Sequence, residues 1–130
     1  MQLLRTTKYT TDVEQLIESM GHATNLQLLN ELRKKYPEVT ATTVHRITSR
    51  LLEHQLISEA PHDINGSSRY DANIELHDHF SCQSCGGIRD IDVAEKVIPT
   101  ISKALGGCSI TGRLVIYGSC ETCLIKNKEN

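Results

Sequence analysis

The first half of the chain alternates apolar and polar residues with the period of an α-helix. From Thr11 onward, apolar side chains recur every three or four residues, which predicts an amphipathic helix that begins at Thr11 or Asp12 and ends at Gly21. The preceding residues, 1–10, are too few and too polar for a further complete helix. The apolar positions of the predicted helix are Val13, Leu16, Ile17 and Met20.

Two more helices follow with the same period. The second is capped by Thr24 or Asn25 and ends before Pro37, after basic residues that suit the negative end of the helix dipole. The third begins near Thr40–Thr42 and runs to about His54. The inward-facing positions are Leu28, Leu29 and Leu32 in the second helix, and Val44, Ile47, Leu51 and Leu52 in the third.

A β-hairpin is predicted next, with strands at 56–60 and 69–71 and a turn-rich tip at 62–68. Three short helices and a hairpin predict a winged helix-turn-helix domain over residues 1–73. The outward face of the third helix offers hydroxyl, imidazole and guanidinium groups, which favours a DNA recognition helix over an ordinary solvated face. The candidate DNA-binding residues are Thr42, Thr43, His45, Arg46, Ser49 and Arg50.

The period of the pattern changes to two after residue 73. Phe80 on one side of the segment 82–87, and Ile88 and Ile91 on the other, predict an antiparallel strand pair around a zinc knuckle. Glycine commonly ends such a knuckle because the backbone must fold under the metal. A strand is also predicted over residues 109–118.

A helix is predicted between these strands, over residues 93–105, with a kink or break at Pro99. The expected fold class is therefore α+β: a winged-helix domain followed by a small α/β domain over residues 74–130. This second domain is too small to be stable alone, so we expect both a zinc clamp and a partner subunit that covers its open sheet.

Composition narrows the class of protein. The 130 residues carry 14 Lys and Arg against 16 Asp and Glu, and both halves are nearly neutral, so DNA binding must come from a local patch. One Phe and no Trp leave an aliphatic core. No apolar run has membrane-spanning length and the start is not a secretory signal, so we expect no membrane partner and a cytoplasmic location.

The cysteines predict a structural metal site. In a reducing cytoplasm, paired CxxC motifs favour metal or redox chemistry over structural disulfides. Cys82 and Cys85 form one pair and Cys120 and Cys123 the other, which is the pattern of a tetrahedral zinc site with four thiolates. The remaining Cys108 is interpreted as a small residue near a strand edge.

A second metal site is indicated by two histidines immediately before the first CxxC. His77 and His79 alternate along a predicted strand, so both imidazoles face the same side, whereas Asp78 faces the other and would serve only a different site. Candidates that complete the site are His22, Asp71 and Asp90. Three His and two Asp suit Fe(II), Mn(II) or Zn(II), and ligands from both domains would couple metal binding to domain orientation.

These residues together resemble the ferric uptake regulator family of metal-dependent bacterial repressors, over nearly the whole chain. The resemblance implies an N-terminal winged helix, a C-terminal α/β dimerisation domain, a homodimer and a palindromic double-stranded DNA operator. The matching stretches are His22-Ala23-Thr24, Tyr36-Pro37, Ala41-Thr42-Thr43-Val44-His45-Arg46, Arg69-Tyr70-Asp71, His77-Asp78-His79-Phe80-Ser81-Cys82 and Leu114-Val115-Ile116-Tyr117-Gly118-Ser119-Cys120.

Within the family, the chain is most similar to the peroxide-responsive repressors. Their regulatory metal is held by three His and two Asp, at the positions of His22, Asp71, His77, His79 and Asp90. The resemblance implies that Fe(II) there reacts with peroxide, oxidises His22 or His77 and releases the DNA, which is sensing rather than enzymatic turnover. The alternative is an iron-, manganese- or zinc-uptake regulator. The iron-sensing branch usually has Glu in place of both Asp residues, and the zinc-sensing branch often has a Cys near the wing.

Three features depart from the family pattern. The leading helix is nearly absent, and His45 stands where the family usually has Tyr in the recognition helix. Leu76 and Gly112 occupy positions where an additional sheet-domain metal site would need His.

Two other classes of function compete with this interpretation. One is a zinc-stapled winged-helix module that binds protein instead of DNA. The other is a thiol–disulfide enzyme, which is disfavoured because redox CxxC motifs usually begin a helix, whereas both pairs here flank short strands and glycine.

Overall fold

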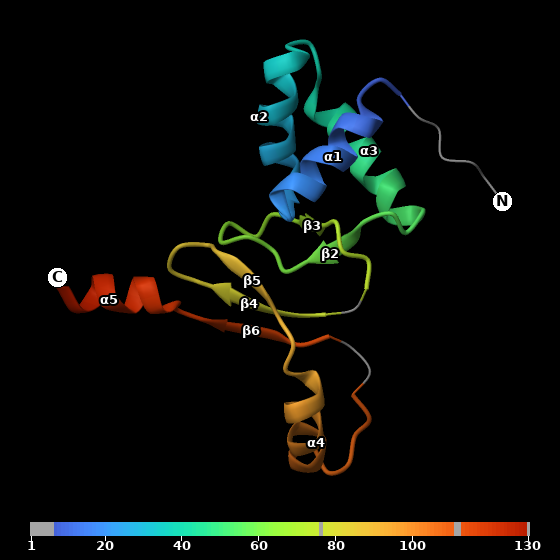
Figure 1. The fold of residues 1–130 in the computed structure, drawn as a ribbon. Coiled ribbons are helices and arrows are strands. Elements are labelled where there is room, and N and C mark those ends of the chain that lie inside the picture. Colours follow the sequence, from blue (N-terminus) through green and yellow to red (C-terminus); the bar gives the residue numbers. More distant parts are fainter. Residues whose placement is uncertain (1–6, 76, 111–112, 130) are drawn as a thin grey trace. The chain divides into compact units, whose positions relative to one another are not determined.

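The computed structural model describes residues 7–75, 77–110 and 113–129, and the chain divides into two compact units, Met1–Glu75 and Leu76–Asn130 (Figure 1). Each unit combines helices with its own three-stranded sheet. Leu76 and Gly112, which bear on the additional metal site, lie outside the described residues. No helix in the described ranges is long and apolar enough to cross a membrane.

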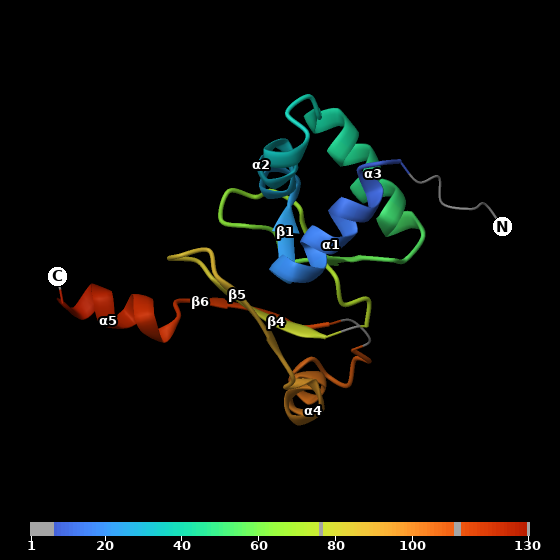
Figure 2. The same ribbon diagram turned by 45° about the horizontal axis from the view of Figure 1, so that its top comes forward.

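The first unit contains three helices packed on a small sheet. The strand order is β1-β3-β2, with both pairings antiparallel. Figure 2 shows β1 between the end of α1 and the start of α2. The elements are α1 (Thr10–Met20), β1 (His22–Thr24), α2 (Asn25–Lys35), α3 (Ala41–Glu53), β2 (Ser58–Ala60) and β3 (Arg69–Asp71).

The core of this unit is aliphatic, as the composition predicts. Each helix directs its periodic apolar residues inward, so the predicted inward faces of all three helices are confirmed, except that Met20 is exposed and Leu16 and Leu52 are only partly buried. The side chains with no exposed surface include Val13, Ile17, Leu28, Val44 and Leu51.

The helix starts follow local hydrogen bonding. Thr24 caps α2 in a capping box with Gln27, and Thr40 caps α3. The predicted start of α1, at Thr11 or Asp12, is one or two residues late: the helix begins at Thr10, and Tyr9 at its N-cap makes no side-chain cap. The buried Thr10 hydroxyl accepts instead from the backbone N–H of Thr7, at 3.0 Å, so the turn closes before Thr11.

The second unit is built on a sheet of order β5-β4-β6, in which β4 pairs antiparallel with β5 and parallel with β6. The predicted antiparallel pair is confirmed, whereas the predicted strand at 109–118 is shorter. The final helix was not predicted. The elements are β4 (Asp78–Cys82), β5 (Ile88–Ile91), α4 (Ala94–Ala104), β6 (Val115–Gly118) and α5 (Glu121–Glu129).

The sequence predicts a kink or a break at Pro99. Pro99 lies inside α4 and the helix continues to Ala104, so it is not broken there. Proline removes one backbone N–H, which in a helix would donate to the carbonyl four residues earlier, at Glu95. Both residues are exposed on this helix, where a carbonyl oxygen without an intrahelical donor can be hydrated, and this makes the loss tolerable.

Asp78 has a structural role that the sequence analysis missed. Its carboxylate is buried and accepts the backbone N–H groups of Leu114 (3.0 Å), Val93 (3.2 Å) and Ala94 (3.0 Å). These N–H groups, that of Leu114 foremost, hold the pKa of Asp78 below its usual range. The residue considered for a separate metal site therefore joins β4 to the start of α4 and to the segment before β6.

Candidate metal centres

The four cysteines of the two CxxC motifs meet at one end of the second sheet. Cys82 ends β4, Cys85 lies in the turn toward β5, Cys120 immediately precedes α5, and Cys123 lies in its first turn. The parallel pairing of β6 with β4 carries the chain after β6 to the knuckle, because the two strands end at the same edge (Figure 1). The topology of the sheet thus brings the two motifs together.

The spacing of the sulfur atoms fits a zinc ion. Cys82 Sγ lies 3.8 Å from Cys123 Sγ, Cys85 Sγ lies 4.0 Å from Cys120 Sγ, and all four sulfurs are within 4.8 Å of one another. Four Zn–S bonds of about 2.3 Å in a tetrahedron place neighbouring sulfurs roughly 3.8 Å apart. An all-thiolate set is the donor chemistry of structural zinc sites, so the residues fit this ion.

Backbone N–H groups surround the cysteine sulfurs. Cys82 Sγ accepts from Cys120 N at 3.3 Å and from Cys85 N at 3.4 Å, which lowers the pKa of the Cys82 thiol to about 6. The pKa of Cys123 is raised to about 12, chiefly by its hydrogen bond with the Cys120 side chain. The site therefore holds one sulfur ready as a thiolate, and a divalent cation would favour ionisation of the others.

The knuckle depends on glycine, as the sequence analysis predicts. Gly86 has a positive φ of 78°, in the region that favours glycine. At Gly87 a Cβ atom would lie 3.3 Å from Cys85 Sγ, and its backbone N–H donates to that sulfur at 3.4 Å. A side chain at Gly86 would be strained by this positive φ, and a side chain at Gly87 would crowd Cys85 Sγ.

An ion pair joins β5 to the start of α5. One guanidinium nitrogen of Arg89 lies 2.6 Å and 2.7 Å from the two carboxylate oxygens of Glu121, while its guanidinium carbon lies 5.9 Å from the Phe80 ring centre. This exposed contact links β5 to the helix that carries Cys123.

The position of α5 corrects one step of the sequence analysis. The Cys120–Cys123 pair does begin a helix, so the expectation that both pairs flank only strands and glycine is wrong for the second pair. The cluster itself disfavours a thiol–disulfide enzyme. The sulfur atoms of the two pairs lie within 4.8 Å of one another, which is the arrangement of a four-cysteine metal site.

The first unit contributes two candidate ligands of the regulatory metal. His22 on β1 lies directly opposite Asp71 on β3 in the antiparallel register, and His22 Nε2 is 3.1 Å from Asp71 Oδ2. The Asp71 side chain is 3% exposed and that of His22 is 14% exposed, so the pair is shielded from bulk water. Strand β1 was not predicted, and it is this pairing that brings His22 to Asp71.

The second unit contributes three candidate ligands. His77 Nε2 and His79 Nε2 each lie 3.2 Å from Asp90 Oδ1, and the two imidazole rings are 4.3 Å apart. The β4–β5 register pairs His79 with Asp90. Both rings thus converge on one carboxylate oxygen, as nitrogen ligands around an oxygen-bound cation would.

The candidate DNA-binding residues lie along α3. Thr42, His45, Arg46 and Arg50 are exposed, whereas Thr43 and Ser49 are half-buried. The Thr43 hydroxyl is 3.1 Å from that of Thr40, the N-cap of this helix, so it also belongs to the helix start.

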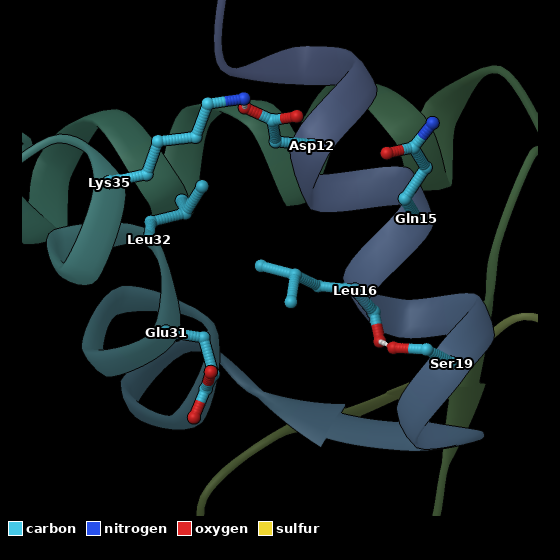
Figure 3. Close-up of a pocket in the computed structure, with 7 residues that line it drawn as sticks. All are labelled: Asp12, Gln15, Leu16, Ser19, Glu31, Leu32 and Lys35. Atoms are coloured by element: carbon cyan, nitrogen blue, oxygen red, sulfur yellow. Dashed lines mark hydrogen bonds and ion pairs between the residues drawn. The ribbon is translucent and has the colours of Figure 1, made fainter.

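A separate groove of about 320 Å³ lies between α1 and α2 (Figure 3). Leu16 and Leu32 give it an apolar surface, and an ion pair of 3.4 Å between Lys35 and Asp12 lies at its edge. None of the candidate metal ligands or DNA-binding residues lines it. The complete lining is Asp12, Gln15, Leu16, Ser19, Glu31, Leu32 and Lys35.

Comparison with known proteins yields consistent matches. The sequence profile of the Ferric uptake regulator family matches residues 2–117. The peroxide operon regulator of Bacillus subtilis is 31% identical over 124 residues, which cover 91% of this chain and 81% of that protein.

Two solved structures also match more than nine-tenths of this chain. The Helicobacter pylori ferric uptake regulator, described as having three functional metal-binding sites, superposes with a TM-score of 0.76 at 22% identity, over 92% of this chain and 82% of that one. A zinc uptake regulator complexed with zinc and DNA superposes with a TM-score of 0.61 at 21% identity, over 95% and 86% of the two chains. At 22% and 21% sequence identity, these two matches show that the fold is shared, and they show nothing beyond the fold.

Substitution of one zinc-ligand candidate tests the cysteine cluster. We expect Cys82→Ser or Cys123→Ser to lose the one zinc ion per chain and to give unfolded or monomeric protein, because metal binding and folding of so small a unit are linked. Metal analysis and size-exclusion chromatography measure both effects. Cys108→Ser is the matched control, since Cys108 is exposed and outside the cluster. A stable dimer in either ligand variant would contradict the assignment.

Proposed function

This chain belongs to the ferric uptake regulator family, and we propose that it is a dimeric, metal-activated transcriptional repressor that leaves its DNA when the iron-loaded form meets peroxide. The single observation that carries this proposal is the sorting of candidate ligands into two sets. A four-sulfur set fits structural zinc, and a separate His and Asp set fits a reactive or exchangeable metal.

The first unit is proposed to bind DNA as a winged helix. Three helices are followed by the β2–β3 hairpin, and α3 has the position of a recognition helix. Its exposed Arg46 and Arg50 offer donors for guanine or phosphate, and His45 adds an imidazole. A protein of this fold has been described in complex with DNA, which supports the same partner here.

The second unit is proposed to form a homodimer. Among its described residues, Cys82 is the only buried apolar side chain, and α4 buries none of its residues. A unit with so little core is stabilised by covering its apolar surface, and a second copy provides a matching one. Two-fold symmetry of the dimer then implies a palindromic operator. The large apolar side chains exposed in this unit are Leu105, Ile116, Tyr117, Leu124 and Ile125.

One regulatory ion is proposed to take ligands from both units. The His22–Asp71 pair provides two donors, and the cluster of His77, His79 and Asp90 provides three. Two donors alone hold a first-row ion weakly, whereas five are a full coordination sphere for Fe(II) or Mn(II). A shared ion would favour one orientation of the DNA-binding unit over others, and that difference in stability is what a switch needs.

Peroxide sensing is proposed to act through the histidine ligands. Fe(II) held by these ligands would activate peroxide, so that one peroxide oxygen is inserted into a ring C–H bond of a nearby histidine and the other leaves as water. His22 and His77 are the candidate targets, because each offers its Nε2 beside a candidate carboxylate ligand. An oxidised ring would be a weaker nitrogen ligand, so the ion would be held less tightly and the DNA-binding orientation would no longer be favoured. The Bacillus subtilis relative, named for the peroxide operon, supports this branch of the family.

The second candidate function is an iron-, manganese- or zinc-uptake regulator without peroxide sensing. The same ligand set favours it, because three His and two Asp accept Zn(II) as well as Fe(II) and Mn(II). This alternative keeps the zinc cluster, the dimer and the DNA-binding unit, and it differs only in the fate of the iron-loaded form.

Metal dependence of DNA binding tests the repressor function. We expect zinc-retaining protein to select a palindromic duplex from a randomised pool only after loading with Mn(II) or Fe(II), and to lose affinity as salt rises. Arg46→Ala or Arg50→Ala should weaken binding to that duplex roughly tenfold or more. Lys34→Ala is the matched control, because Lys34 is an exposed cation on α2. If Fe(II), Mn(II) and Zn(II) all fail to raise the affinity for DNA, the proposal that metal binding activates DNA binding is wrong.

A peroxide pulse distinguishes the two candidate functions. In iron-loaded protein we expect one added oxygen on peptides that contain His22 or His77, and none in manganese-loaded protein, since only iron reduces peroxide in this way. Peptide mass spectrometry measures it, with the exposed His62 as the internal control. Iron-loaded protein without oxygen on either ligand would favour the uptake regulator.

A further inference from the structure

The Asn25 side chain connects two helices of the first unit. Asn25 is the first residue of α2, and its amide reaches α3. Asn25 Oδ1 lies 2.9 Å from the hydroxyl of Thr48, and Asn25 Nδ2 lies 3.3 Å from Nδ1 of His45. One amide thus bridges the buried side of α3, at Thr48, and its exposed side, at His45.

Both ends of this bridge are held in place. The capping box of Thr24 and Gln27 fixes the backbone at the start of α2, where Asn25 follows the cap. Thr48 has no exposed surface, so its hydroxyl is anchored in the core. His45 by contrast is exposed, and without a contact its ring would rotate among several orientations.

The anchor at Thr48 determines which group faces the imidazole. The Thr48 hydroxyl donates to Asn25 Oδ1, and this contact is shorter than those to the carbonyls of Val44 (3.3 Å) and His45 (3.1 Å). The Asn25 amide nitrogen, which only donates, is left facing Nδ1 of His45. In this orientation of the amide the ring nitrogen accepts, which puts the proton of the neutral ring on Nε2.

We propose that Asn25 is a positioning residue for DNA recognition, which holds the His45 ring with its Nε2–H outward as a hydrogen-bond donor. A hydrogen-bond donor in the major groove matches three acceptors: N7 of either purine, O6 of guanine and O4 of thymine. It does not match the amino group of cytosine, which is itself a donor. A ring that is oriented before binding also loses less freedom on contact. The proposal rests on the DNA-binding function proposed above and adds the base chemistry that His45 selects.

The tautomer of His45 can be measured without DNA. We expect nitrogen-detected NMR of the metal-loaded dimer to show the proton on Nε2 and an accepting Nδ1. Asn25→Asp is the sharpest variant, because its carboxylate still accepts from Thr48 but offers no N–H to the ring. In this variant Nδ1 should become protonated to donate to the carboxylate. Unchanged His45 nitrogen signals in both Asn25→Asp and Asn25→Ala would overturn the proposal.

A double-mutant cycle tests the effect on recognition. The probes are the duplex selected by the wild-type protein and a panel with single base-pair changes. We expect Asn25→Asp and His45→Ala each to reduce discrimination about three- to tenfold at the same base pair, and Asn25→Asp to have no further effect in the His45→Ala background. Additive effects, or an equal loss of affinity for every duplex, would mean that Asn25 acts on stability or charge alone and would overturn the proposal.

Leu16→Ala provides the matched control. Leu16 is a partly buried residue of α1 and takes no part in the Asn25–His45 contact, so stability should fall while the base preference stays. If the wild-type protein selects no sequence at all, the DNA-binding function is wrong, and the NMR measurement still decides whether Asn25 orients the His45 ring.

Discussion

The convergence of four cysteine sulfurs is the constraint on which the second unit depends. This unit has almost no apolar core of its own, yet it must hold three strands and two helices in register. The sulfurs join the end of β4, the turn before β5 and the start of α5, at distances that match tetrahedral zinc. Zinc bound there, as proposed, would take the place of apolar burial in holding the short sheet that carries His77, His79 and Asp90.

The proposed regulatory ligands are positioned by strand pairing in both units. In the first, β1 places His22 opposite Asp71, and in the second, β4 places His79 opposite Asp90. Both registers are maintained by backbone hydrogen bonds and not by the metal, so each set of ligands is organised before an ion binds. Preorganised ligands cost less conformational entropy on binding, which suits a site that must load and unload. Asp78, facing away from the site, is used to hold α4 and β6 in place.

Much of this arrangement could be predicted from local patterns, and the remainder depends on contacts distant in sequence. The helical period of the apolar residues, among them Val13 and Ile17 in α1 and Leu28 in α2, predicts which side chains are buried. The spacing of the CxxC motifs likewise predicts which cysteines could bind a metal ion. Strand β1 has only three residues, and it exists because β3, far along the chain, pairs with it. The structural role of Asp78 depends on N–H donors at residues 93, 94 and 114, which no local pattern reveals.

Two features were missed for a related reason. Helix α5 lacks a regular apolar face, so the period that revealed the other helices gives no signal there. The amide of Asn25 was considered only as a helix cap, whereas its contacts with Thr48 and His45 form through the packing of α2 against α3.

One regulatory ion is proposed to take ligands from both units. The most direct test is a titration of zinc-loaded protein with Mn(II), with the free ion measured by electron paramagnetic resonance, for the wild type, His22→Ala and Asp90→Ala. We expect one bound ion per chain, and a loss of affinity of at least roughly tenfold in both variants, since each removes a ligand of the same ion. Wild-type affinity in either variant, or one ion bound independently by each unit, would contradict it.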